Sequence, residues 1–258
     1  LTVLKLEISD GNVDVTMGDS LAGSYTFDNE NLANGAVEGA AGTVVTNKTL
    51  QENDNTMTYV EGRNGGKAVS FDGTADGNVV KLDATLTGNQ QTISFWMNTT
   101  AYNNFSSAMF ALDTDTTNYV NVIPHGWDDD SLSPQYAEGV SGTINNTAGA
   151  EGSVNVGEWH MVTFVVDGTS LTIYKDGQAV RAFQNSEFVD TASVTDGFWN
   201  TFDSIYLGGN LWDNTYNGAI DDVYLYNKAL TAEEVAALYG YIPSTGVSID
   251  GEENIEIT

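Results

Sequence analysis

The chain has 258 residues, of which 8 are basic and 36 acidic, and its formal net charge is −28 at pH 7. A surface this acidic repels phosphate backbones and anionic lipids, which excludes nucleic acids and anionic membranes as partners but leaves neutral ligands and calcium. The chain has no cysteine, which excludes disulfides and a thiol nucleophile and fits a bacterial secreted or cell-surface protein.

Short runs rich in β-branched and aromatic residues, separated by Gly, Asp and Asn, recur along the chain and indicate strands. The expected strands cover residues 3–8, 21–27, 68–71, 78–82, 91–97, 108–112, 119–123, 156–167, 171–180 (a hairpin), 204–209 and 218–226. Polar stretches at 29–42, 124–134 and 184–203 read as loops. One helix is expected after residue 230, because Thr231 and Glu234 have the spacing of a capping box.

This pattern predicts an all-β fold: an antiparallel two-sheet jelly-roll sandwich with one short C-terminal helix. In the expected helix, Val235, Leu238 and Tyr239 repeat at the spacing of one apolar face. No repeat of fixed period is visible in the chain. No apolar run approaches the length of a membrane span.

Six short motifs follow one another in the sequence. They are Tyr25-Thr26-Phe27-Asp28, Ala68-Val69-Ser70-Phe71-Asp72-Gly73, Thr92-Ile93-Ser94-Phe95-Trp96, Gly157-Glu158-Trp159-His160-Met161-Val162, Leu171-Thr172-Ile173-Tyr174-Lys175-Asp176-Gly177, and the stretch 218–239. In this order they resemble the laminin-G-like branch of the concanavalin A-like lectin/glucanase fold, in its bacterial jelly-roll form. The resemblance implies a jelly-roll domain over residues 19–241.

The flanking segments have a different character. Residues 1–18 are expected to be an N-terminal extension or the end of a preceding domain. Pro243-Ser244-Thr245-Gly246 reads as a linker, and residues 244–250 resemble the start of a bacterial immunoglobulin-like module. Residues 242–258 are therefore expected to hold a linker and the start of a following domain, which implies a secreted, multi-modular bacterial protein.

Two aspartates lie at the ends of expected strands. Asp28 ends the first strand of the family pattern and Asp221 begins the last, so antiparallel pairing of these strands brings the two carboxylates together. Two anions at close range repel unless a cation lies between them, and calcium accepts carboxylate and carbonyl oxygens. The sequence therefore predicts a structural calcium held by Asp28 and Asp221, with Asn31 of the following loop as a further ligand. The resemblance implies the same two aspartates.

Asp221 is preferred to Asp222 as the ligand because it has the strand parity of Val223 and Leu225, the expected core face. The alternative interpretation is that Asp28 and Asp221 are turn residues whose carboxylates accept hydrogen bonds from nearby N–H groups.

The sequence contains no recognisable catalytic pair. Glucanases of this fold carry two carboxylates on one strand face, two or four residues apart, flanking the scissile bond. No such spacing occurs on an expected strand, and the two histidines, His125 and His160, lie on different elements without a nucleophile partner. The chain is therefore predicted not to be an enzyme.

The tryptophans divide into two groups. Trp96 and Trp159 lie inside expected strands and are assigned to the core, whereas the other three lie in polar, turn-rich stretches where a large apolar ring is costly to expose without use. Sugars present apolar C–H faces to aromatic rings, and their hydroxyls pair with Asp, Asn and His. The predicted sugar-binding residues are His125, Trp127, Asp129, Trp199, Trp212 and Tyr216. The alternative is that these aromatics anchor long loops to the sandwich.

These observations favour a non-catalytic, lectin-like carbohydrate-binding module of an extracellular bacterial polysaccharide-degrading enzyme. The expected ligand is a neutral glycan or polysaccharide, and the module is expected to be a monomer, linked covalently to neighbouring domains. One alternative is an adhesin or structural spacer that binds protein. A second is a glycosidase whose carboxylate pair is not recognisable in the sequence.

Overall fold

A computed structural model describes residues 20–103, 105–113, 119–124, 154–184 and 187–240. Of four further short strands, at 8–9, 12–13, 133–137 and 145–146, it describes the backbone. In this part of the chain no helix is long and apolar enough to cross a membrane. The predictions for residues 1–18 and 242–258 fall almost entirely outside the described residues and stay predictions.

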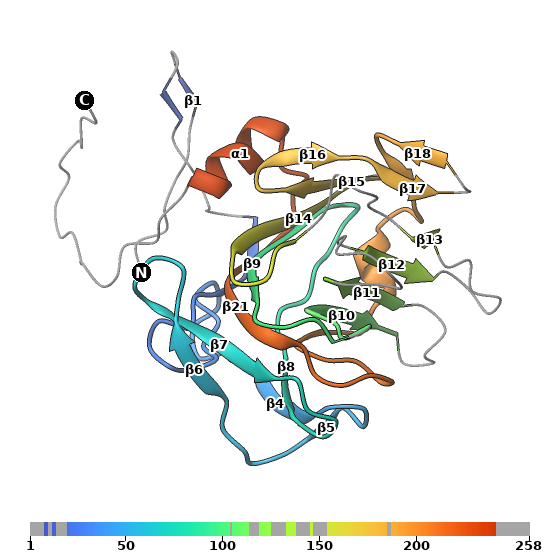
Figure 1. The fold of residues 1–258 in the computed structure, drawn as a ribbon. Coiled ribbons are helices and arrows are strands. Elements are labelled where there is room, and N and C mark those ends of the chain that lie inside the picture. Colours follow the sequence, from blue (N-terminus) through green and yellow to red (C-terminus); the bar gives the residue numbers. More distant parts are fainter. Residues whose placement is uncertain are drawn as a thin grey trace, which may run out of the picture.

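Two antiparallel sheets stack to form a sandwich (Figure 1). The nine strands of the first sheet are β3 (Leu21–Tyr25), β6 (Thr58–Glu61), β7 (Lys67–Asp72), β9 (Gln90–Thr99), β14 (Trp159–Asp167), β15 (Ser170–Lys175), β16 (Gln178–Val180), β19 (Ala192–Ser193) and β21 (Asn217–Tyr226). Their order is β16-β15-β14-β9-β21-β7-β6, with β19 beside β15 and β3 beside β21. Strand β21, the last strand of the described residues, therefore lies in the middle of its sheet.

The second sheet has eight strands. They are β4 (Thr43–Thr46), β5 (Gln51–Glu52), β8 (Asn78–Lys81), β10 (Met109–Leu112), β11 (Tyr119–Ile123), β12 (Ser133–Ala137), β13 (Asn145–Asn146) and β20 (Ser204–Leu207). Their order is β13-β12-β11-β10-β20-β8-β4-β5. The remaining elements are the pairs β1 (Ile8–Ser9) with β2 (Asn12–Val13) and β17 (Ala182–Gln184) with β18 (Glu187–Val189), the 3₁₀ turn η2 (Phe198–Thr201) and the helix α1 (Ala232–Gly240).

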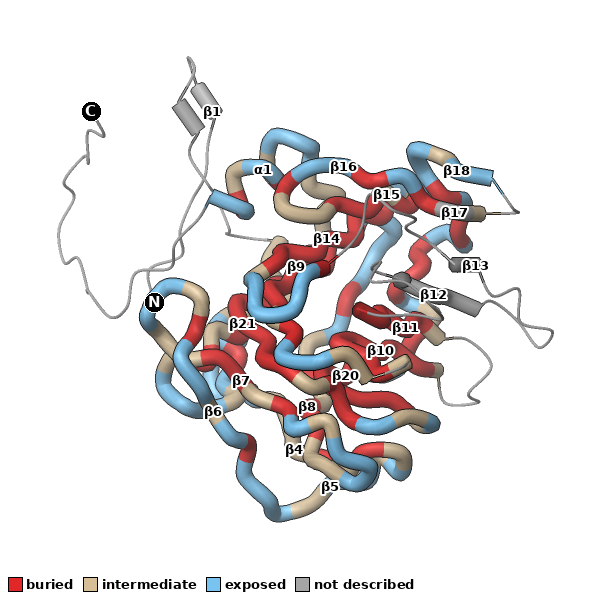
Figure 2. Tube along the Cα trace, viewed as in Figure 1, coloured by how far each residue is buried: buried red, intermediate tan, exposed pale blue. Residues whose placement is uncertain are grey.

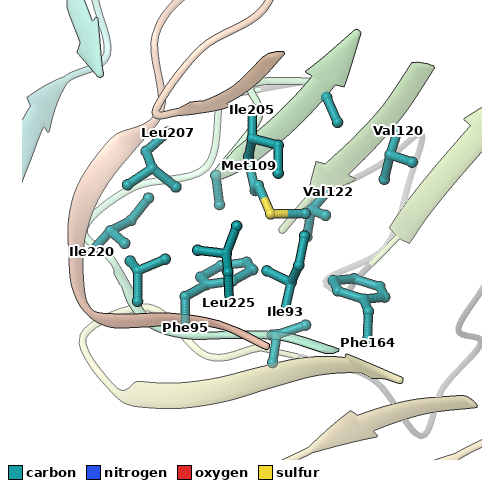
Figure 3. Close-up of a cluster of buried hydrophobic side chains, with 14 of the residues drawn as sticks. Ile93, Phe95, Met109, Val120, Val122, Phe164, Ile205, Leu207, Ile220 and Leu225 are labelled. Carbon is teal, nitrogen blue, oxygen red and sulfur yellow. The ribbon is translucent and has the colours of Figure 1, made fainter. Parts of the chain in front are cut away.

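The core lies between the two sheets. Ile93, Phe95, Phe164, Ile220 and Leu225 of the first sheet face Met109, Val120, Val122, Ile205 and Leu207 of the second (Figure 3). All ten side chains are buried, and burial of this kind is the main favourable term in folding. The predicted all-β sandwich is confirmed.

The central strands of the first sheet are buried on both faces. The middle residues of strand β9 are buried almost without interruption (Figure 2). The reason is a second apolar cluster on the outer face of this sheet, which includes Trp96 of β9 and Val235 and Leu238 of α1. The helix covers this outer face, so the alternation expected of a half-exposed strand is lost.

Helix α1 begins as predicted. The Oγ1 of Thr231 accepts the N–H of Glu234 at 3.2 Å, and the Glu234 carboxylate accepts the N–H of Thr231 at 2.9 Å, which is a capping box. Tyr239 stacks on Trp96 with ring centroids 5.3 Å apart, and this contact attaches the last turn of the helix to the sheet.

Candidate functional site

Strand β21 changes its partner at Asp221 and Asp222. On one side of these residues, 217–220 pair with β7, and on the other, 223–226 pair with β3. The end of β3 and the start of β7 therefore meet beside the two aspartates. The predicted antiparallel pairing of the first and last strands of the family pattern is confirmed, with Tyr25 opposite Val223.

A β-bulge lies at the same point of β21. Asp221 pairs with Trp96 and Tyr224 with Ser94, so Asp222 and Val223 together oppose one residue of β9. The extra residue shifts the alternation of side chains, and Asp221 shares the outer face with Trp96. The prediction that Asp221 lies on the same, core-facing side of the strand as Val223 is therefore wrong, because the bulge interrupts the alternation of side chains between the two faces.

The three carboxylates at this corner are held by a glycine-rich turn. Asp28 Oδ1 accepts the backbone N–H of Lys67 at 3.1 Å, and Asp221 Oδ2 accepts the N–H of Arg63 at 2.9 Å. The Arg63 guanidinium lies 3.3 Å from Asp222 Oδ2 and 3.9 Å above the centre of the Trp96 ring. A Cβ at Gly66 would collide with Asp28 Oδ1, so only glycine permits this approach.

Burial makes this corner electrostatically costly. Asp221 and Asp222 are each only 4% exposed. Burial raises the pKa of both carboxyl groups, and for Asp221 the charge of Asp222 raises the pKa further. Asp28 acts on both in the same direction, while Arg63 opposes the rise at Asp222. Arg63 is ion-paired with Asp222, whereas Asp28 and Asp221 accept hydrogen bonds from the backbone N–H groups of Lys67 and Arg63.

The donor set at this corner suits a hard cation such as calcium, which takes carboxylate, carbonyl and water oxygens. Within the described residues, no group of three or more acidic, histidine or cysteine side chains has the arrangement of a metal site. A cation here would therefore take part of its ligands from the backbone or from water. Asn31 Oδ1 accepts the N–H of Ala33 at 3.0 Å in an exposed turn, and its part as a calcium ligand stays a prediction.

The structure separates the predicted sugar-binding residues. His125, Trp127 and Asp129 lie outside the described residues. Trp199 and Tyr216 are 2% and 1% exposed, so no sugar can stack on them. For these two residues the prediction is wrong, and the alternative, that loop aromatics anchor loops to the sandwich, holds.

Each of the two buried aromatics has packing that explains its position. Trp199 packs in η2 against Phe164, with ring centroids 6.1 Å apart, and against Phe198 at 5.2 Å. The Tyr216 hydroxyl lies 2.9 Å from Thr99 Oγ1 within the core. Both residues therefore belong to the main hydrophobic core, although they lie in polar stretches of the sequence.

Of the predicted sugar-binding residues in the described part of the chain, Trp212 is the exposed one. Its exposed fraction is 51%. Its ring stands edge-on to Phe110 at 5.6 Å and to Tyr119 at 5.2 Å, on the outer face of the second sheet. An aromatic ring that is both accessible and held by other rings is a suitable platform for an apolar sugar face.

A buried polar network fixes the loop that carries Trp212. Asn210 is fully buried, and its Oδ1 accepts the N–H groups of Trp212 at 2.7 Å and Asp213 at 2.8 Å. Its Nδ2 donates to Ser107 Oγ at 2.7 Å, and Asn47 Oδ1 accepts the Asn210 N–H at 3.1 Å. The loop is therefore shaped by hydrogen bonds before any ligand arrives.

A groove of about 320 Å³ lies on the same outer face. Its apolar and aromatic lining comes from Leu50, Leu112, Tyr206 and Leu211, and its polar lining from Thr49, Asp113, Asp203 and Ser204. Leu211 places the groove next to Trp212 in the chain, and Tyr206 pairs with Phe110 across β20 and β10. The described part of the chain thus brings one accessible indole and one groove together.

Reasoning from the sequence missed this groove. Ile205 and Leu207 are core residues, so the intervening Tyr206 must face outward. That alternation was available in the sequence as a signal for an aromatic side chain on the outer face. Among the described lining residues none is basic, and the two carboxylates accept hydrogen bonds, which suits hydroxyl donors.

Comparisons with known proteins agree with this fold. A family model described as the concanavalin A-like lectin/glucanases superfamily matches residues 72–236. Domain 4 of AbnA, a GH43 extracellular arabinanase from Geobacillus stearothermophilus, solved with arabinotriose, is similar at 24% identity and a TM-score of 0.67, over 85% of this chain and 98% of that one.

Two toxin structures are also similar. The botulinum neurotoxin type G receptor-binding domain matches at 14% identity and a TM-score of 0.54, over 86% of this chain and 51% of that one. The binding domain of Paraclostridial Mosquitocidal Protein 1 matches at 15% identity and a TM-score of 0.55, over 86% and 52%. No curated protein sequence matches the chain. Taken with the two-sheet sandwich, the family match establishes that this chain belongs to the concanavalin A-like lectin/glucanase superfamily.

Proposed function

We propose that this chain is a non-catalytic carbohydrate-binding module that holds a neutral polysaccharide in the groove beside Trp212. The observation that carries the proposal is the accessible indole of Trp212, fixed edge-on against Phe110 and Tyr119 next to a groove lined by both apolar and polar side chains. Ligand sites combine apolar walls with a few polar groups in this way. The net charge of −28 disfavours acidic glycans, which is why the ligand is neutral.

The module acts as a monomer within a larger extracellular bacterial protein that degrades polysaccharides. Two observations support this setting: the similarity to a domain of an extracellular arabinanase, and the absence of cysteine from the chain. That domain was solved with arabinotriose, so arabinan is the first polysaccharide to test.

The test is affinity electrophoresis of the purified chain in gels that contain arabinan, xylan, β-glucan or polygalacturonate. We expect retardation by at least one neutral polymer, none by polygalacturonate, and loss of retardation in Trp212→Ala. Phe188→Ala, which removes another half-exposed aromatic on β18, is the matched control. If no neutral polymer retards the chain, the proposal fails, and the alternative role as an adhesin or spacer that binds protein becomes the better one.

We also propose a structural calcium at the corner of Asp28 and Asp221. The buried carboxylates, the raised pKa values and the glycine-rich turn that closes over Asp28 support it. Bound calcium would neutralise charge that the N–H groups of Arg63 and Lys67 offset only in part. It would hold the end of β3 against the start of β7, and it has no part in contacting the sugar.

The calcium proposal is tested by thermal unfolding with calcium and with EDTA. A ligand that binds only the folded state stabilises it by about 2.7 kcal/mol when its concentration is a hundred times the dissociation constant. We expect calcium to raise the unfolding temperature of the natural chain and to have no effect on Asp221→Asn. Asp54→Asn, an exposed acid elsewhere, should respond like the natural chain. An unfolding temperature that is the same in calcium and in EDTA contradicts the proposal.

A further inference from the structure

We infer that the groove and the Trp212 ring are consecutive sugar-binding positions, so that the ligand is an internal segment of an uncharged linear polysaccharide. This inference rests on the carbohydrate binding proposed above and specifies the class of ligand. It excludes two other classes, a single sugar and the end of a chain.

The groove is small for a ligand-binding site. About 320 Å³ lies at the lower end of the range of roughly 300 to 1,000 Å³ found for small-molecule sites. A groove at this lower limit holds only a short part of a polysaccharide. A longer ligand therefore has to continue over the neighbouring surface of the sheet.

The groove crosses the strands: Thr49 and Leu50 lie in the turn between β4 and β5, Tyr206 lies in β20 and Leu112 in β10. The next strand along this line is β11, where Tyr119 is the cross-strand partner of Leu112. Tyr119 is one of the two rings that hold Trp212, so the indole continues the line that the groove begins.

The Trp212 ring is held in position before a ligand binds. The Trp212 backbone is fixed by the buried Asn210, and its ring rests on two other aromatics, yet half of the residue stays accessible. A platform formed in advance costs little conformational entropy when a ligand arrives. A sugar ring inside the groove cannot cover this platform as well, so the platform adds affinity when several linked sugars bind together.

The surface around the groove is acidic, because the chain carries a net charge of −28 and Asp113 and Asp203 line the groove. Carboxylates accept hydrogen bonds from sugar hydroxyls and repel uronic acids and sulfated sugars. The segment that fits is therefore uncharged.

The test is isothermal titration of the whole chain with linear oligosaccharides of one to six units from arabinan, xylan and β-glucan. For the series that binds, we expect affinity to rise about tenfold between two and four units and then to level off, as contact with a second aromatic anchor would give. Reduction of the terminal sugar of the six-unit ligand to its alditol should leave the affinity unchanged, because a chain end is not recognised.

Two variants separate the positions. Trp212→Ala should abolish the gain in affinity with ligand length, whereas Phe188→Ala should leave that gain unchanged. Equal affinity for one unit and for six, or loss of binding on reduction of the chain end, overturns this inference and leaves the proposed function standing. If no oligosaccharide and no parent polysaccharide binds, the proposed function itself fails.

Discussion

The carboxamide of Asn210 holds Trp212 in place: its Oδ1 accepts the Trp212 N–H at 2.7 Å while its Nδ2 donates into the protein interior. Asn210→Ala should therefore act on both stability and binding. Loss of the side chain removes the acceptor of the Trp212 and Asp213 N–H groups, and each buried group left unsatisfied costs about 1–3 kcal/mol.

This prediction is checked by urea unfolding together with the fluorescence of the variant. We expect a lower unfolding midpoint, a shift of the Trp212 emission to longer wavelength and weaker polysaccharide binding. Asn55→Ala, which removes an exposed carboxamide, is the control. If the folded Asn210→Ala variant binds the polysaccharide as tightly as the natural chain, the loop does not depend on the hydrogen bonds of Asn210.

The turn before β7 offers a second prediction. Gly66→Ala should destabilise the protein by about 1–3 kcal/mol, the usual cost of forcing an extra methyl group into a packed site, because the new Cβ meets the Asp28 carboxylate. The same displacement should weaken the response of the unfolding temperature to calcium. Gly240→Ala, where the added Cβ meets nothing within 4 Å, should leave both properties unchanged. A fully stable Gly66→Ala protein would mean that Asp28 is free to move away.

Asp176 gives a prediction for low pH. Burial raises the pKa of this carboxyl, but hydrogen bonds from His160 Nδ1 at 2.8 Å and the Met161 N–H at 2.9 Å outweigh it, so the net effect is a lowered pKa. A carboxyl whose pKa is lower in the folded state adds stability above its unfolded pKa of about 3.9. That stability is lost as the pH falls from there through the folded-state pKa.

Asp176→Asn keeps a residue that tolerates the left-handed turn, whose φ is 51°, and removes the charge. Urea midpoints measured between pH 6 and pH 2.5 should fall less steeply for this variant than for the natural chain. Parallel curves for the two proteins would show that the contact between His160 and Asp176 does not stabilise the ionised carboxyl.

The net charge predicts a dependence on salt. Repulsion among 36 acidic residues opposes folding, and salt shortens the screening length from about 30 Å at 0.01 M to about 10 Å at 0.1 M. The urea midpoint should therefore rise between 0.01 M and 0.5 M NaCl, measured with EDTA present so that calcium is not involved. A midpoint that falls with salt would mean that favourable ion pairs outweigh the repulsion.

Two acids in the groove call for a test of hydrolysis. Asp113 follows Leu112 and Asp203 precedes Ser204, and these neighbours pair across β10 and β20, so both acids lie at one end of the groove. A glycosidase needs carboxyl groups that flank the scissile bond. We expect no release of reducing sugars from any polysaccharide that binds. Release that disappears in Asp203→Asn would establish a catalytic role.

The sequence predicted those parts of the fold that local patterns determine. The capping box of α1, the central strands and the meeting of Asp28 with Asp221 all follow from residues close together in the chain or from the order of motifs. Strands β4, β5 and β6 were missed, because they are short and partly exposed and depend on partners distant in sequence. The bulge at Asp222 was likewise invisible, since it arises where two neighbouring strands meet.

The candidate site was less predictable than the fold. Trp199, Tyr216 and Trp212 lie in similar polar stretches, yet the first two fill the interior and the third faces solvent. The two tryptophans differ in the aromatic rings that they contact: Trp199 packs against Phe164, and Trp212 packs against Phe110. That information is tertiary, and composition around each tryptophan does not contain it.

The central place of β21 has a consequence for how the chain reaches its folded state. Among the described residues this strand is the last along the chain, yet it joins β9 on one side to β3 and β7 on the other. During synthesis, the edges of β3, β7 and β9 that pair with β21 stay unpaired until residues 217–226 emerge from the ribosome. Such long-range pairing folds slowly and exposes strand edges to other chains. Truncation before residue 217 should therefore yield an aggregating chain and not a smaller folded domain.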